Sequence, residues 1–64
     1  MTTANFTSEV FAYIEQTYDK STLRKVKNKK NNTIVDKLLG DSLSKEYSAS
    51  KTANKIIAML RLNP

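Results

Sequence analysis

The side chains best able to bind a partner in this chain are cations that crowd into one segment. Residues 20–30 hold six basic side chains and no acidic one: Lys20, Arg24, Lys25, Lys27, Lys29 and Lys30. Like charges this close repel one another, so the cluster indicates an anionic partner. On a helix, Lys20, Arg24 and Lys27 would share one face, with Leu23 and Val26 turned away. Such a face can follow a phosphate backbone.

Two other interpretations of this basic segment stay open. It can be a solvated run that keeps the protein in solution or offsets residues 1–19, which hold three acidic side chains and no basic one. It can also bind anionic lipid, an acidic protein or ribosomal RNA. No aromatic residue lies within residues 20–30, which argues against stacking on single-stranded nucleic acid.

A second candidate surface opens the last expected helix. Its polar and basic residues are Ser50, Lys51, Thr52, Asn54 and Lys55. Residues 43–62 resemble a helix-turn-helix, in which the second helix presents hydrogen-bond donors to a DNA groove. Leu43, Ser44 and Tyr47 would lie on the first helix, with Ser48 and Ala49 in the turn. The turn lacks the usual glycine, and Asn54 stands where a buried aliphatic residue is expected. The alternative is an ordinary amphipathic helix with a solvated polar face.

The residue types that are absent exclude several kinds of site. The chain has no Cys and no His, so it cannot form a zinc finger, a disulfide, a thiol nucleophile or an imidazole acid or base. Its one glycine, Gly40, cannot make a glycine-rich phosphate loop. Nothing in the pattern indicates that Asp36, Asp41 and Glu46 converge in a cleft. We therefore expect no enzyme, no cofactor and no metal.

The elements that would position these side chains can be predicted from caps and apolar spacing. Thr7 is a candidate N-cap for a first helix of about eleven residues, with Phe6 and Phe11 as a hydrophobic staple and a stripe that includes Val10 and Ile14. Asp19 or Ser21 can cap a short second helix over residues 22–30.

The remaining helices follow from the same signals. Asn32 is expected to cap a helix over residues 33–39, which Gly40 would end in the left-handed conformation. One or two separate helical turns would follow over residues 41–47. Ser48 or Ser50 would cap the last helix, which Asn63 and Pro64 would end. Its apolar stripe is Ala49, Ala53, Ile56, Ile57 and Leu60. The sequence predicts an all-α fold: a small compact bundle of four or five short helices, in one domain over residues 1–64.

The length and apolar pattern of the chain predict its cellular location and whether it self-associates. The chain has 64 residues, and its longest uninterrupted apolar run, residues 56–60, is far shorter than the roughly 20 residues that span a bilayer. We expect a cytoplasmic protein without a membrane partner. The apolar stripes exceed what so small a core hides, which predicts a homodimer.

These observations favour a small basic helical protein that binds duplex DNA and regulates transcription, of the kind found in phages and other mobile elements. Residues 20–30 would contact phosphates, and the start of the last helix would approach a groove. The alternative is a protein-binding module, an adaptor or inhibitor that docks its basic face on an acidic protein.

Overall fold

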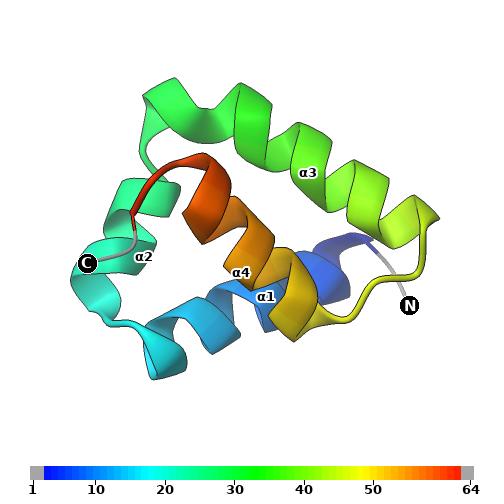
Figure 1. The fold of residues 1–64 in the computed structure, drawn as a ribbon, viewed down its shortest axis with the longest axis horizontal. Helices are drawn as coiled ribbons and strands as arrows, with labels where there is room; N and C mark the ends of the chain where they lie inside the picture. The colour runs from blue at the N-terminus through cyan, green and yellow to red at the C-terminus, as the bar shows by residue number, and fades with distance from the viewer. Residues whose placement is uncertain (1–2, 63–64) are drawn as a thin grey trace.

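Four α-helices and one 3-10 turn account for most of the chain in the computed structural model, which describes residues 3–62. They are α1 (Thr3–Thr17), α2 (Lys20–Val26), η1 (Lys29–Asn31), α3 (Asn32–Ser44) and α4 (Ala49–Met59). In Figure 1, α4 runs between α1 and α3, and α2 lies at one end of the molecule. The predicted all-α fold is confirmed. No helix within residues 3–62 has the length and apolar character needed to cross a membrane.

The first helix begins earlier than its apparent cap. Thr7 lies inside α1, so the predicted N-cap and hydrophobic staple are wrong. Phe6 is only 3% exposed and continues the buried stripe of Val10 and Ile14 by one turn toward the N-terminus. Tertiary packing of an apolar face stabilises a helix more than a local cap does, and here it favours the longer helix.

Asp19 caps α2, as one of the two predicted alternatives. Its Oδ1 accepts a hydrogen bond from the backbone N–H of Thr22 at 2.6 Å. The helix is shorter than predicted and ends at Val26, whose side chain is buried in the core. The side-chain amide of Asn31 donates to the carbonyl of Lys25 at 2.8 Å, which satisfies a carbonyl at the end of α2.

The third helix passes through the position predicted to end it. Gly40 lies in the interior of α3 and has no positive φ, and the turns predicted over residues 41–47 are largely the continuation of this helix. The buried residues of α3 explain the difference, because they form one stripe on both sides of Gly40: Val35, Leu38, Leu39 and Ser42. Asn32 is the first residue of α3 rather than its cap.

Both α3 and α4 end in a left-handed residue that is not glycine. Glu46 has φ 60° and Arg61 has φ 55°. After α3, the N–H of Tyr47 donates to the carbonyl of Ser42 at 2.9 Å, and after α4 the N–H of Leu62 donates to that of Ile57 at 3.0 Å. These are Schellman motifs, which reverse the chain and satisfy the last carbonyls of a helix.

The predicted start and apolar stripe of α4 are confirmed. The hydroxyl of Ser48 accepts a hydrogen bond from the N–H of Lys51 at 3.2 Å. Ala53, Ile56 and Ile57 are fully buried, with α1 as the main packing partner of α4. The helix ends at Met59, and the predicted stop at residues 63–64 lies outside the described residues.

The apolar stripes cover one another within a single chain. Among the described residues, Ile34 and Met59 are the exposed large hydrophobic side chains, at 45% and 60% exposure. The expectation that the stripes exceed what one chain can hide is therefore wrong for residues 3–62. The homodimer stays a prediction without that support.

Candidate nucleic-acid interface

Four of the predicted cations gather around one shallow depression on α2 and the segment that follows it. Lys20, Arg24, Lys27 and Lys29 line it, together with Leu23, Asn28 and Glu15 of α1. We call these four cations the α2 basic patch. The predicted common face of Lys20, Arg24 and Lys27 is present, but Leu23 also lines the depression and is not turned away from it.

The other two predicted cations are not part of this patch. Lys25 lines a different hollow, with Tyr18, Asp19 and Arg61. Lys30 is exposed on η1, where its backbone N–H donates to the side chain of Asn28 at 3.0 Å. Within residues 3–62, no lysine or arginine forms an ion pair with a carboxylate, and Glu15 is the one acidic side chain that lines the depression of the α2 basic patch.

A second cationic group surrounds an aromatic ring between α3 and α4. The ammonium nitrogens of Lys51, Lys55 and Lys45 lie 4.0, 5.5 and 5.9 Å from the centre of the Tyr47 ring. We call these four residues the Tyr47 cluster. Each ammonium group thus lies within one Debye length, about 8 Å at physiological salt, of the same ring.

The energetics of the Tyr47 cluster favour an added anion. A cation–π contact at an exposed site is worth about 0.5–1 kcal/mol, whereas a hydrogen bond to a charged group is worth about 1.5–3 kcal/mol. A phosphate beside the cluster would therefore draw the lysine ammonium groups from the ring. It would also relieve their mutual repulsion.

The chain reversal after α3 builds this cluster. The left-handed Glu46 turns the backbone so that Tyr47 lies beside α4, where Lys51 and Lys55 are one helical turn apart. Lys45 is the C-cap residue of α3. The sequence predicts Tyr47 on a helix, and no local signal indicates that its ring gathers three lysines. The reversal depends on a left-handed residue that is not glycine.

The outer side of α4 carries a continuous exposed stripe. Lys51, Asn54, Lys55 and Ala58 are all exposed and follow the three-and-four spacing of one helix face. Oδ1 of Asn54 accepts a hydrogen bond from the hydroxyl of Tyr18 at 2.8 Å. This bond orients the Asn54 amide from outside its own helix and directs its NH₂ group away from Tyr18.

Two of the predicted contact residues on α4 are placed differently. Thr52 is fully buried, and its Oγ1 donates to the carbonyl of Ser48 at 2.9 Å. The expectation that Thr52 presents a donor to a partner is therefore wrong, because its hydroxyl is used to satisfy the first turn of α4. Ser50 is half-buried, with its hydroxyl 3.2 Å from that of Ser48.

Two helices joined by a short connection are present, as in the predicted helix-turn-helix, but the first helix has other bounds than predicted. That helix is α3, which ends at Ser44, and residues 45–48 connect it to α4. Tyr47 lies in this connection rather than on the helix. Asn54 is exposed, so the aliphatic residue usual at that position of the motif has no counterpart here.

The α2 basic patch and the Tyr47 cluster lie in different parts of the molecule. Figure 1 shows the start of α4, in yellow, well away from α2, while the end of α4 approaches α2. A ligand that contacts both groups must therefore extend along the protein. An elongated polyanion meets this requirement and a compact anion does not.

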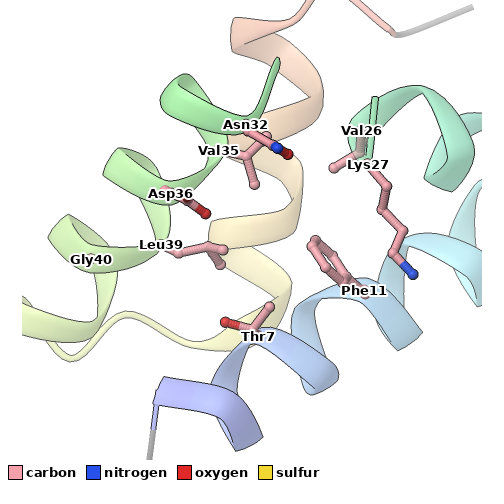
Figure 2. Close-up of a pocket in the computed structure, with 9 residues that line it drawn as sticks. All are labelled: Thr7, Phe11, Val26, Lys27, Asn32, Val35, Asp36, Leu39 and Gly40. Atoms are coloured by element: carbon pink, nitrogen blue, oxygen red, sulfur yellow. The ribbon is translucent and has the colours of Figure 1, made fainter. Parts of the chain in front are cut away.

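A third feature is a cleft between α1, α3 and the end of α2, with a volume of about 370 Å³. Figure 2 shows Phe11 and Leu39 facing one another across it, with Val35 beside them. The ammonium nitrogen of Lys27 lies 5.4 Å from the centre of the Phe11 ring. Asp36 and Gly40 line the α3 side, and a Cβ added at Gly40 would meet no atom within 4 Å. The cleft is thus apolar at its centre and open beside Gly40.

Within residues 3–62, no group of three or more acidic side chains is placed to hold a metal ion. Comparison of the chain with protein-family models, curated proteins and solved structures finds no match.

Proposed function

We propose that this protein binds duplex DNA as a small regulatory protein and not as an enzyme. The α4 stripe would lie at a groove, and the α2 basic patch would contact phosphates farther along the same duplex. The observation that carries the proposal is the exposed stripe of Lys51, Asn54 and Lys55, in which the asparagine amide is oriented by Tyr18.

The chemistry of this stripe suits the major groove. Asparagine can bond both the N6 amino group and N7 of adenine, and lysine can donate to the O6 and N7 acceptors of guanine. An α-helix fits into the groove of B-form DNA, and small side chains such as that of Ala58 permit close approach. The α2 basic patch would add phosphate contacts, which fix register on the duplex without reading sequence.

The proposal is tested by fluorescence anisotropy with a labelled duplex of mixed sequence at about 50 and 200 mM salt, because counterion release makes phosphate contacts visible in this range. Three double variants each remove two positive charges. Arg24→Ala with Lys29→Ala removes two of the four cations of the α2 basic patch. Lys51→Ala with Lys55→Ala removes both lysines of the exposed stripe on α4. Lys30→Ala with Lys37→Ala is the matched control, since both lysines are exposed and lie outside the two groups and outside the hollow beside Tyr18.

The wild-type protein is expected to bind with an affinity that falls steeply with salt. The variant of the α2 basic patch should lower the slope of log K against log salt by about 1.8, as expected for two lost phosphate contacts, and the variant of the stripe should lower the affinity itself. The control should leave the slope within error. Equal slopes for all three variants would mean that binding follows net charge alone, and absence of binding at 50 mM salt would refute the proposal.

The cleft of Figure 2 favours a second candidate function, the docking of an acidic protein segment. Lys27 lines both this cleft and the depression of the α2 basic patch. An apolar side chain could occupy the space between Phe11 and Leu39 while neighbouring carboxylates meet the patch. If duplex DNA does not bind, the protein should capture an acidic peptide that contains one aromatic residue, and Phe11→Ala should abolish that capture.

Homodimer formation and a cytoplasmic location belong to the same proposal. Dimers of helix-turn-helix proteins place two recognition helices about one helical turn apart on DNA. Light scattering of the complex should then give the mass of the duplex plus twice the chain mass of 7.2 kDa. A mass of one chain per duplex at saturation would contradict the dimer.

A further inference from the structure

A cavity of about 600 Å³ lies near the Tyr47 cluster, between the start of α1 and the reversal after α3. Phe6, Leu43 and Ala49 supply its apolar lining, and Tyr47 also lines it. Phe6 is buried, whereas the other three are half-buried and remain accessible to a ligand. The volume lies in the range typical of small-molecule sites.

Two carboxylates line the same cavity from different elements. Glu9 comes from α1 and Glu46 from the reversal after α3, and both are exposed. Glu46 has a left-handed backbone, which glycine would adopt without strain. Carboxylates here can accept N–H donors, and they would repel a ligand that is anionic at this end.

The lysines of the Tyr47 cluster do not line the cavity but surround a residue that does. Tyr47 is shared, because it lines the cavity and its ring has Lys45, Lys51 and Lys55 around it. A ligand that spans both regions needs a flat apolar body, N–H donors for the carboxylates and a negative charge for the lysines. A nucleotide with an amino-bearing base has all three.

We propose that this cavity binds one unpaired nucleotide, with its base against Tyr47, its amino edge toward Glu9 and Glu46, and its phosphate on the lysines. Guanine is the best fit, because N1–H and N2–H together can donate to one carboxylate. The proposal rests on the proposed function in one respect, since Lys51 and Lys55 serve both. It implies that the protein binds strand ends, bulges or flipped bases.

The first experiment is an NMR titration of the amide and methyl groups of the whole chain with four probes. GMP should give saturable shifts at Phe6, Leu43 and residues 46–49. UMP should bind about tenfold more weakly, because it lacks the amino group. Inorganic phosphate should affect the lysine side of Tyr47 only, and guanosine should bind more weakly than GMP. Identical shifts from GMP and inorganic phosphate would overturn the proposal, because the base would then make no contact.

Variants separate the parts of the site. Tyr47→Leu should abolish the shifts from GMP, and Glu46→Gln should remove the preference for GMP over UMP while phosphate binding persists. Phe11→Leu is the matched control, since it removes an aromatic ring that also has a lysine nearby but lines the other cleft. If Tyr47→Leu fails to fold, Glu46→Gln still tests the proposal. An unchanged GMP preference in Glu46→Gln would overturn the role of the carboxylate.

A last comparison distinguishes a free nucleotide from one in a strand. A duplex with a single unpaired 5′ guanosine should bind more tightly than its blunt counterpart, and Glu46→Gln should remove that difference. If GMP binds but the overhang adds nothing, the ligand is a free nucleotide. If blunt duplex binds while neither GMP nor the overhang has an effect, the nucleotide site is refuted and the proposed function stands. If GMP binds and blunt duplex does not, the proposed function fails alone.

Discussion

The hydroxyl of Tyr18, just after α1, donates a hydrogen bond to Oδ1 of Asn54, in the middle of the exposed stripe of α4. The two residues are 36 positions apart in the sequence. The bond therefore couples the packing of two helices to the orientation of one exposed amide. It predicts that a residue remote from the stripe affects what the stripe can recognise.

Replacement of Tyr18 by phenylalanine should weaken sequence discrimination more than stability. The ring is retained, and an exposed hydrogen bond contributes at most about 1 kcal/mol to the free energy of unfolding. Freed from Tyr18, the Asn54 amide can rotate, so preference for a specific duplex over a mixed one should fall toward that of Asn54→Ala. Competition anisotropy measures this ratio. Tyr13→Phe is the control, and an equal effect of both variants would contradict a specific role for Tyr18.

Gly40→Ala should raise the free energy of unfolding by about 0.5–1 kcal/mol. Glycine in a helix interior is less favourable than alanine by this amount, and the added Cβ meets nothing within 4 Å. The melting temperature should rise by several degrees in calorimetry. A fall in melting temperature would show that the space beside Gly40 in the cleft of Figure 2 is occupied.

Glycine substitutions at two adjacent positions after α3 should have opposite effects. Glu46→Gly should stabilise the protein by about 0.5–1 kcal/mol, because relief of the left-handed backbone exceeds the added freedom of the unfolded chain. Lys45→Gly, at a residue with φ −90°, should destabilise it by a similar amount. Denaturant midpoints check both. The same sign for the two variants would contradict the backbone explanation.

The cap of α2 should make stability depend on acid pH. Hydrogen bonds from the backbone and side chain of Thr22 lower the pKa of the Asp19 carboxyl below its ordinary value. Because the folded pKa is the lower one, the contribution of Asp19 is present above the unfolded pKa and is lost as pH falls through the folded pKa.

Asp19→Asn isolates this effect, since asparagine also caps helices but does not titrate. The stability advantage of the wild-type protein over the variant should be constant above about pH 5 and should shrink toward pH 2. Urea unfolding at a series of pH values measures the difference. An advantage that grows on acidification would contradict the assigned direction of the pKa shift.

Local signals were sufficient for the helices whose caps and stripes agree. Asp19 and Ser48 were predictable because each cap directly precedes its helix, and the stripe of α4 has regular spacing. Gly40 was misleading because the buried stripe on either side of it outweighs its preference for a helix end. Thr7 was misleading for the same reason, since burial of Phe6 extends α1.

The candidate site was less predictable than the fold. The α2 basic patch follows from a run of lysines in the sequence, but which of them share a face depends on where α2 ends. Thr52 is of a residue type that can contact DNA, yet its hydroxyl donates to the carbonyl of Ser48. The Tyr47 cluster could not be predicted from local signals, because its members become neighbours only through the chain reversal at Glu46.

The overall size of the molecule limits how much information it can read. Its longest dimension is 28 Å, which corresponds to about eight base pairs of B-form DNA at 3.4 Å each. A specific sequence of eight base pairs occurs by chance on the order of once in every 65,000 positions, whereas genomes offer about 10⁶–10⁹ competing sites. One copy that acts on duplex DNA alone would therefore bind at many positions in a genome. Selective action at a single locus would require adjacent copies, a second protein, or an irregular structure such as an unpaired base.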